Sequence, residues 1–271
     1  MKLRRNIVFG VFIATLIQFP VYAAGIVVDG NLSDWGLNRT GSESDWVPNF
    51  SLGQSLQYAV EDQHDAYLNP GWGGQAYDAE ALYTFMDNTY LYLALVTGLS
   101  PETKDNSLEN SYGAGDFAFD FGQDGSFELG LGTTKEDAGK LYRVSEWSYG
   151  LWDVDGNYAP NDADKSHPTS IKTSTQLNAA ISFVYTTVGF QNMGKYAADS
   201  HYVIEAAIPL VAFSGFTGKF DVHWTMNCAN DAILVDPVIG TVPEPAGLAL
   251  LFSGLAMMAV APRRRPSFVA A

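Results

Sequence analysis

The sequence predicts an all-β fold: a jelly-roll-like antiparallel β-sandwich, flanked by an N-terminal signal helix and a C-terminal transmembrane helix. Three observations lead to this prediction. Short stretches in the middle of the 271-residue chain alternate apolar and polar residues, with turn signals between them. No segment of the middle keeps a helical period. Each end of the chain carries an uncharged apolar run close to a cluster of basic residues.

The first element is a signal peptide, predicted over residues 1–23. Three basic residues within the first five precede an apolar run over 7–17. A Val-Tyr-Ala triplet that ends at Ala23 then suits signal peptidase, which would cut after it. The alternative is an uncleaved N-terminal anchor, although the run is short against the roughly 20 residues of a membrane span.

The last element, predicted over residues 241–271, has three parts in order. A Pro-Glu-Pro triplet comes first, an uncharged apolar run over 246–261 follows, and an arginine triplet comes after it. Because positive charge stays cytoplasmic, the arginines orient a membrane helix with its C-terminus inside, which agrees with export of the middle. A buried core helix is the alternative. The residues of the two triplets are Pro243, Glu244, Pro245, Arg263, Arg264 and Arg265.

This ordered tail resembles the PEP-CTERM sorting signals that exosortase reads, over about the last thirty residues. The resemblance implies a Gram-negative bacterium that makes exopolysaccharide. It also implies a transient anchor in the inner membrane, cleavage near the Pro-Glu-Pro triplet by an exosortase-type protease, and release to the cell surface or beyond. The segment after the arginines, 266–271, is longer and more apolar than such tails require, which leaves cleavage open but not anchoring.

Between the two signals lies one domain, predicted over residues 24–240. Its clearest strands are predicted over 90–96, 116–121 and 220–227. Each of these strands is expected to pack one face against a core. Asp-Gly and similar turn pairs separate the strands, which favours an antiparallel sandwich over an α/β fold. Two long polar loops, 97–115 and 153–170, are the expected positions of binding residues.

Four segments of this domain carry a further pattern. An opening that contains Asp29-Gly30 and Asp34-Trp35 spans 26–35, and an aspartate-led strand spans 87–96. A Gly-Asp-Phe-Ala-Phe-Asp strand spans 115–120, and the last strand of the pattern, which contains Glu205 and Pro209, spans 202–210. In this order they resemble family 9 carbohydrate-binding modules and their DOMON-like relatives. The resemblance implies a β-sandwich that binds carbohydrate and contains calcium.

Composition narrows the classes of function. The formal net charge of −15 repels nucleic acid and anionic lipid and favours cations or neutral ligands. Cys228 is the only cysteine, so no internal disulfide forms, and a buried thiol is expected. No nucleophile elbow, zinc-protease motif or phosphate loop occurs, so we predict that the protein is not an enzyme. A carboxylate pair for glycoside hydrolysis stays open as an alternative.

Calcium is the expected cofactor, because closely spaced carboxylates supply the oxygen ligands of this ion. Asp78 and Glu80 share one side of a predicted strand and are expected to form one site with Asp120 and Asp124 from a neighbouring strand end. The acidic loop 153–164 is a second candidate. It begins like an EF-hand loop, but its glycine falls too early and the final glutamate is missing. A solvated acidic loop is the alternative for both.

Sugar recognition needs exposed aromatic rings with polar groups at their rim. The candidates are Trp72, Tyr77, Trp147 and Trp152. Trp72 stands among glycines, which predicts an exposed loop. The other tryptophans in strand-like motifs, Trp35 and Trp224, are expected in the core.

The leading hypothesis is therefore a non-catalytic exported surface or matrix protein that binds extracellular polysaccharide. The main alternative is a matrix protein without a sugar ligand, whose acidic surface bridges to partners through calcium.

Overall fold

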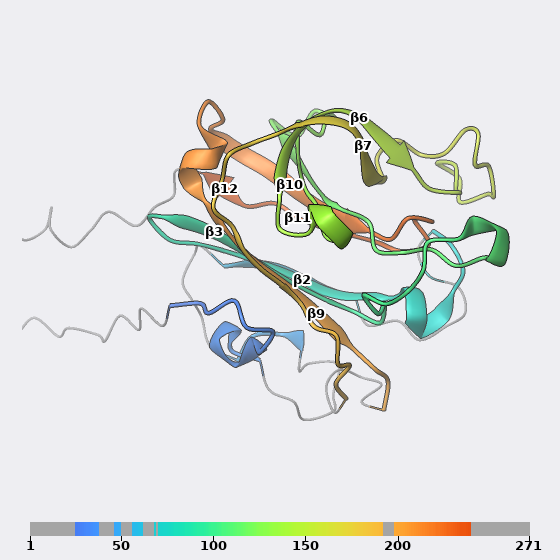
Figure 1. Ribbon diagram of the computed structural model, residues 1–271, viewed down its shortest axis with the longest axis horizontal. Coiled ribbons are helices and arrows are strands. Elements are labelled where there is room, and N and C mark those ends of the chain that lie inside the picture. The colour runs from blue at the N-terminus through green and yellow to red at the C-terminus, as the bar shows by residue number, and fades with distance from the viewer. Residues whose placement is uncertain are drawn as a thin grey trace, which may run out of the picture.

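Two antiparallel sheets packed face to face confirm the predicted β-sandwich (Figure 1). The structure is a computed structural model, and it describes residues 25–37, 46–49, 56–61, 68, 70–191 and 198–239. Regular structure within these residues consists of strands and short 3-10 turns. No helix in this described part is long and apolar enough to span a bilayer. The predicted signal peptide and sorting tail, with both of their helices, lie outside the described residues.

The first sheet has five strands in the order β1-β2-β3-β9-β8. Their bounds are Gln57–Val60 for β1, Ala79–Met86 for β2, Tyr90–Thr97 for β3, Ser182–Tyr185 for β8 and Tyr202–Pro209 for β9. The chain leaves this sheet after β3 and returns to it after β7. The two sheets are therefore built from interleaved parts of the sequence.

The second sheet follows the order β11-β10-β4-β5-β6-β7, and β12 also pairs with β10. The strands are β4 (Phe117–Phe121), β5 (Leu129–Leu131), β6 (Leu141–Tyr149), β7 (Pro168–Gln176), β10 (Gly218–Thr225), β11 (Ala232–Val235) and β12 (Val238–Ile239). The 3-10 turns are η1 (Leu32–Trp35), η3 (Gly74–Tyr77), η4 (Ser107–Glu109), η5 (Lys135–Asp137) and η6 (Leu210–Phe213).

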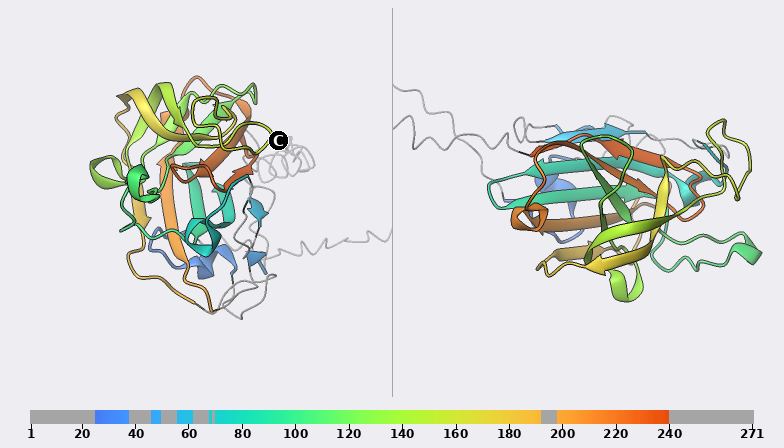
Figure 2. Two further views of the ribbon diagram at one scale, coloured as in Figure 1. Left: turned by 90° about the vertical axis from the view of Figure 1, so that its right-hand side faces the viewer. Right: turned by 90° about the horizontal axis from the view of Figure 1, so that it is seen from above.

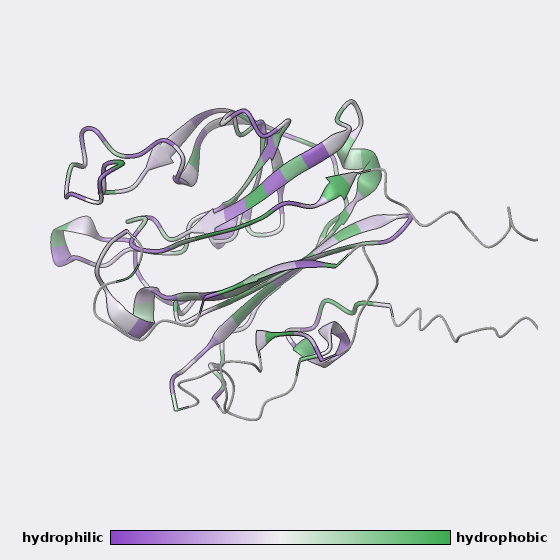
Figure 3. Cartoon of the chain, turned by 180° about the vertical axis from the view of Figure 1, so that it is seen from behind, coloured by the Kyte–Doolittle hydropathy of each residue, from purple (hydrophilic) through white to green (hydrophobic). Residues whose placement is uncertain are grey.

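The core between the sheets contains the residues that the alternation of the sequence predicted. Leu91, Leu93 and Leu95 of β3 face the phenylalanines of β4 and Trp224 of β10 across the sandwich, and all three leucines are fully buried. Strands alternate between hydrophobic and hydrophilic residues along their length in Figure 3, and many of the loops are hydrophilic. Cys228 also lies in this core as a buried free thiol, as expected.

A second apolar layer covers the outer face of the first sheet. The opposite face of β3, with Tyr92, Ala94 and Val96, is buried as well, although the sequence predicted only one buried face. The segment around η1 lies across this face, as the blue segment in Figure 1 shows, and contributes the fully buried Trp35. Trp46 is fully buried in the same apolar cluster. The N-terminal segment therefore acts as a third layer, which the period of a single strand cannot reveal.

Glu205 of β9 holds this third layer in place. Its Oε1 accepts a hydrogen bond from Trp35 Nε1 at 2.8 Å. Its Oε2 accepts bonds from the backbone nitrogens of Gly30 at 2.5 Å and Asp29 at 3.1 Å. Burial raises the pKa of Glu205 to about 7, against the lowering effect of these donors. One buried carboxyl group thus links the first sheet to the opening motif of the domain.

Candidate functional site

Long loops gather at one end of the sandwich, on the right in Figure 1 and again on the right in the second view of Figure 2. The turn between β10 and β11 joins them. Its residues Asn227, Cys228 and Asn230 bond to the backbone of three separate loops, at Gly113, Leu151 and Gly71 respectively. The three N···O distances are 2.7–3.0 Å. A turn of the second sheet therefore positions loops that are distant in the sequence.

Three aromatic residues at this end form a surface that we call the aromatic edge: Trp72, Trp152 and Tyr158. Trp72 is 57% exposed and Tyr158 is 67% exposed. The rings of Trp152 and Tyr158 meet edge to face, with centroids 6.0 Å apart. The exposure of Trp72 agrees with the prediction from its glycine-rich surroundings.

Asn230 fixes the relative position of the two tryptophans. Its Oδ1 accepts a hydrogen bond from Trp152 Nε1 at 2.9 Å, and its Nδ2 donates to the carbonyl oxygen of Trp72. Gly71 allows this close approach, because a Cβ there would lie 2.5 Å from Cε2 of Trp152. The side-chain amide of Asn230 thus binds both Trp72 and Trp152, which are eighty positions apart in sequence.

The other two predicted sugar-binding aromatics lie elsewhere. Tyr77 is half-buried at the end of η3, where its hydroxyl accepts a bond from the backbone nitrogen of Tyr112 at 3.2 Å. Trp147 of β6 is buried, and its Nε1 donates to the carbonyl oxygen of Phe127 at 2.9 Å. Tyr77 borders the aromatic edge through Gly73, whereas Trp147 packs within the second sheet and offers no open ring face.

Four carboxyl groups lie together beneath the aromatic edge, where β1 and β2 pack against β11. We call Glu61, Asp78, Glu80 and Asp231 the carboxyl cluster. Asp78, Glu80 and Asp231 are fully buried, and Glu61 is half-buried. Asp231 accepts a bond from the backbone nitrogen of Ala79 at 2.7 Å, which joins the start of β2 to the start of β11. The cluster therefore bridges the two sheets.

Like charges and burial act together in the carboxyl cluster. Burial first, and the charge of Glu80 next, raise the pKa of Asp78. Burial and the charge of Asp231 raise the pKa of Glu61 in the same direction. Burial also raises the pKa of Asp231, although the hydrogen bond from Ala79 opposes that rise. A divalent cation or bound protons would relieve this repulsion.

The partners of the cluster do not satisfy it. Glu80 Oε1 accepts a bond from Gln75 Nε2 at 2.6 Å and lies 3.1 Å from His201 Nε2. Asp78 and Glu61 each lie within hydrogen-bonding reach of Asp231, so each of these two pairs of carboxyl groups can share a proton. Glu80 Oε2 and Gln75 Oε1 have no partner among the described residues. Buried polar atoms in native proteins nearly always have partners, so the two oxygens without one, Glu80 Oε2 and Gln75 Oε1, are unusual.

The sequence predicted one calcium site from Asp78, Glu80, Asp120 and Asp124, and the structure does not bring these two pairs together. Asp120 pairs with Asp221 of β10. Asp78 and Glu80 lie beside Asp231, which binds Ala79 and adjoins the pair of Ala232 with Thr225 at the other end of β10. At roughly 3.3 Å per residue, four residues of β10 separate the two places by about 13 Å. The length of β10 therefore keeps Asp78 and Glu80 too far from Asp120 and Asp124 for all four to share one ion.

Asp120 and Asp124 instead form a group with Glu128, whose ligand atoms all lie within 4.8 Å of one another. This spacing suits a metal ion. However, backbone donors already bind the group: Asp120 accepts from the nitrogens of Asp124 and Gly125, and Glu128 accepts from Phe121. These bonds account for the turn between β4 and β5 without any ligand.

The second calcium candidate, the loop 153–164, is held by its own backbone. Asp153 Oδ1 accepts bonds from the nitrogens of Asp155 at 3.0 Å and Asn157 at 2.8 Å. The bond from Asn157 is the main reason that the pKa of Asp153 is lowered. The loop carries Tyr158 and so supports the aromatic edge.

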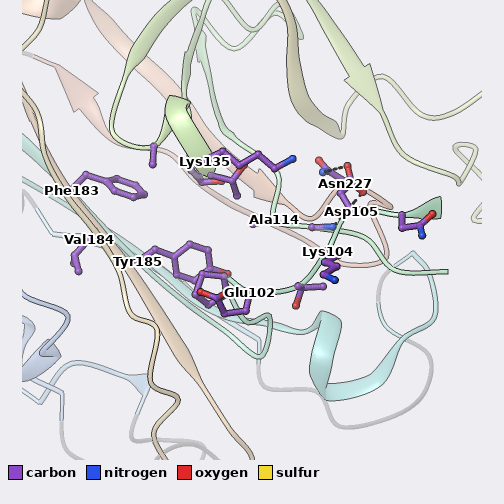
Figure 4. Close-up of a pocket in the computed structure, with 16 residues that line it drawn as sticks. Glu102, Lys104, Asp105, Ala114, Lys135, Phe183, Val184, Tyr185 and Asn227 are labelled. Carbon is purple, nitrogen blue, oxygen red and sulfur yellow. Dashed lines mark hydrogen bonds between the residues drawn. The ribbon is translucent and has the colours of Figure 1, made fainter. Parts of the chain in front are cut away.

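A groove of about 900 Å³ opens beside this end, between the edge strand β8 and the turn that contains η5 (Figure 4). Phe183 and Tyr185 of β8 line one side, and Lys135 lines the other. Asn227 Nδ2 donates to Asp105 Oδ2 at 3.0 Å where the groove meets the β10–β11 turn. The predicted loop 97–115 thus borders this groove.

Sequence reasoning missed Asn230, Asp231, Glu61, His201 and Tyr158. No local spacing connects these residues. Glu61 and Asp231 are placed by the pairing of β1 with β2 and the packing of β11, and His201 by the pairing of β9 with β3. Tyr158 forms a bridge to Trp152. Compared with models of known protein families and with curated protein sequences, the chain shows no match. Any conclusion about function therefore rests on the geometry of these residues.

Proposed function

We propose that the protein is a non-catalytic carbohydrate-binding protein that holds a neutral extracellular polysaccharide at the aromatic edge. The observation that supports this proposal is the position of Trp72 and Trp152 on either side of one amide. The exposed ring of Trp72 and the half-buried ring of Trp152 offer flat apolar faces for pyranose rings. The side chain of Asn230 fixes the backbone of Trp72 and the indole of Trp152. Rigid aromatic contacts lose little conformational entropy on binding.

The charge of the chain supports a neutral ligand. A net charge of −15 repels acidic polymers, and the acidic loop beside Tyr158 adds negative charge at the aromatic edge itself. Neutral sugars avoid this repulsion. The nearby groove, with Tyr185 and Lys135 on its walls, offers further polar contacts for a chain longer than one residue.

Replacing Trp72 by alanine is expected to weaken polysaccharide binding about tenfold or more. The loss of one stacked ring removes roughly 1.4 kcal/mol, which corresponds to a factor of ten. Soluble xylan, β-glucan and mannan are the probes, tested by native affinity electrophoresis of the full-length protein in mild detergent. Val211→Ala is the matched control, because Val211 is 79% exposed on η6, away from the edge.

Equal migration of Trp72→Ala and wild-type protein in every gel that retards the wild type would exclude the aromatic edge as the binding surface. No retardation of the wild type by any probe, together with calcium-dependent self-association, would favour the alternative of a calcium-bridged matrix protein.

We further propose that the protein is exported and sorted through its two terminal signals, with an exosortase-type protease and the inner membrane as transient partners. Mass spectrometry of the protein from its native host is expected to find an N-terminus at Ala24 and a C-terminus near Pro243 or Pro245. An intact chain of 271 residues in the cytosol would contradict this proposal.

A further inference from the structure

Two histidines meet on the outer face of the second sheet, away from the core between the sheets. His223 belongs to β10, where both of its neighbours in sequence face that core, and its side chain is only 1% exposed. His167 is the last residue of the loop between β6 and β7, and its Nδ1 lies 3.2 Å from Nε2 of His223. We call these two residues the histidine pair. The pair fastens the loop that carries Tyr158 to the sheet.

The partners of each ring indicate where its proton lies. Nε2 of His167 lies 3.7 Å from Oδ2 of Asp164, and a carboxylate favours a proton on the ring nitrogen that faces it. Nδ1 of His167 is then the acceptor, and His223 donates from Nε2. This arrangement leaves Nδ1 of His223, which has no partner among the described residues, without a proton.

A proton cannot be added to His167 without cost to this contact. The free lone pair of neutral His167 is on Nδ1, the atom that accepts the bond from His223. Protonation therefore turns two N–H groups toward each other. If His223 moves its proton to Nδ1 instead, a buried donor is left where the described residues offer no acceptor. Acid weakens the contact in either case.

Few ionisable groups surround the histidine pair. Within the described part of the chain, the charge of Asp164 acts on His167, and the charge of His167 acts on His223. The residues paired with His223 across the sheet are the apolar Ala118 of β4 and Leu234 of β11. The charged side chains on the surrounding elements include Asp221 of β10, which accepts a bond from Gln123, Lys172 of β7, which pairs with Glu146, Glu128 of the β4–β5 turn, which accepts a bond from Phe121, and the exposed Lys165 of the loop.

The direction of the pH effect follows from burial. Burial first, and the charge of His167 next, lower the pKa of His223 to about 3. Burial also lowers the pKa of His167, although the charge of Asp164 opposes this change. The ordinary pKa of histidine, about 6.5, lies above both folded values. The opened form therefore takes up protons first, so the stability of the contact is present above about pH 6.5 and is lost as pH falls below it.

The histidine pair connects to the aromatic edge through the loop. The nitrogen of His167 donates to the carbonyl oxygen of Asp164 at 3.4 Å, and the nitrogen of Asp164 donates to the carbonyl oxygen of Trp152 at 2.7 Å. Trp152 in turn forms a backbone bridge to Tyr158. Displacement of His167 therefore disturbs two of the three residues of the aromatic edge.

We propose that the histidine pair is a pH-dependent contact that holds the loop 153–167 on the second sheet near neutral pH and releases it in mild acid. The loop opens locally, and both sheets stay folded. Release does not depend on sugar binding. Its consequence, weaker retention of polysaccharide in acid, rests on the proposed function of the aromatic edge.

Hydrogen exchange measured by mass spectrometry tests this proposal on the full-length protein in mild detergent at pH 7.5 and pH 5. After correction for the intrinsic pH dependence of exchange, protection of the segment 153–167 is expected to fall at least about tenfold in acid, whereas β3 is expected to keep its protection. An imidazole that ionises only in the open loop favours opening by roughly thirtyfold at pH 5, which sets this expectation.

His167→Asn separates the histidine pair from other acid effects. An asparagine side chain places an acceptor oxygen close to the position of Nδ1, and this oxygen takes up no proton at pH 5, so the loop is expected to stay protected in acid. Lys165→Gln is the matched control, because Lys165 is exposed in the same loop, and it is expected to respond like the wild type. His223→Leu is expected to lower the protection of the loop already at pH 7.5. If that variant does not fold, His167→Asn still decides the test.

Equal protection of the wild-type loop at pH 5 and pH 7.5 would overturn the proposal. So would a loss of protection in β3 together with the loop, because acid would then unfold the whole domain, or a His167→Asn variant that responds to acid like the wild type. Trp72→Ala is expected to keep the full response of the loop, so a failure of sugar binding and a failure of this proposal are distinguishable.

Discussion

Replacement of Glu205 by alanine is expected to lower the free energy of unfolding by about 2–4 kcal/mol. The change leaves Trp35 Nε1 and the backbone nitrogens of Asp29 and Gly30 without their acceptor. Each buried donor without a partner costs about 1–3 kcal/mol, and only the indole nitrogen is fully buried. Urea denaturation followed by tryptophan fluorescence measures the loss.

Asp34→Ala is the matched control for this variant. Asp34 lies in the same segment, but the bond that its Oδ2 accepts from the nitrogen of Val27 at 2.7 Å is exposed. Its removal is expected to change the free energy of unfolding by less than about 1 kcal/mol. Equal losses in both variants would show that Glu205 does not hold the third layer specifically.

The raised pKa of Glu205 adds a pH dependence with a defined sign. Because the pKa is about 7 in the folded protein and near its ordinary value when unfolded, the folded state holds the proton more tightly. The stability that this group contributes is therefore present at low pH and is lost as pH rises toward and through 7. Glu205→Gln is expected to remove this part of the slope, which unfolding curves between pH 4.5 and 8 would reveal.

Gly98→Ala is expected to destabilise the protein by about 3 kcal/mol or more. It is also expected to disturb the contact between η3 and the carboxyl cluster. A Cβ at Gly98 would overlap the carbonyl oxygen of Gln75 and lie 2.7 Å from its carbonyl carbon. Overpacking against backbone commonly costs about 1–3 kcal/mol, and this overlap is severe. Relief requires η3 to move, and η3 carries Gln75 and Tyr77. Loss of the hydrogen bond from Gln75 Nε2 to Glu80 Oε1 should therefore accompany the loss of stability.

Gly113→Ala is the control for that prediction, since a Cβ there meets its nearest atom at 3.4 Å, an ordinary contact. Its effect on the free energy of unfolding is expected to stay within about 0.5 kcal/mol. If Gly98→Ala unfolds at the same urea concentration as Gly113→Ala, the close approach of η3 to the end of β3 would be disproved.

The sequence by itself determined the class of fold and much of the core. Successive side chains of a strand point to opposite faces, so the alternation of apolar and polar residues shows which ones face the core. This local pattern placed Leu91 and Leu95 of β3 and Trp224 of β10 in the core. The glycines on either side of Trp72 likewise predicted its exposure. Such features depend only on neighbours within a few residues, and the structure confirmed them.

Convergence of distant residues was decided by the tertiary structure alone. The predicted four-residue metal site failed to assemble because Asp120 and Asp231 flank opposite ends of β10, and strand register, not spacing along the chain, sets that distance. Trp147 was buried by its place in the second sheet. Glu61 met Asp78 and Asp231 because β11 packs on β1 and β2, and that contact arises from sheet packing, which local periodicity does not encode.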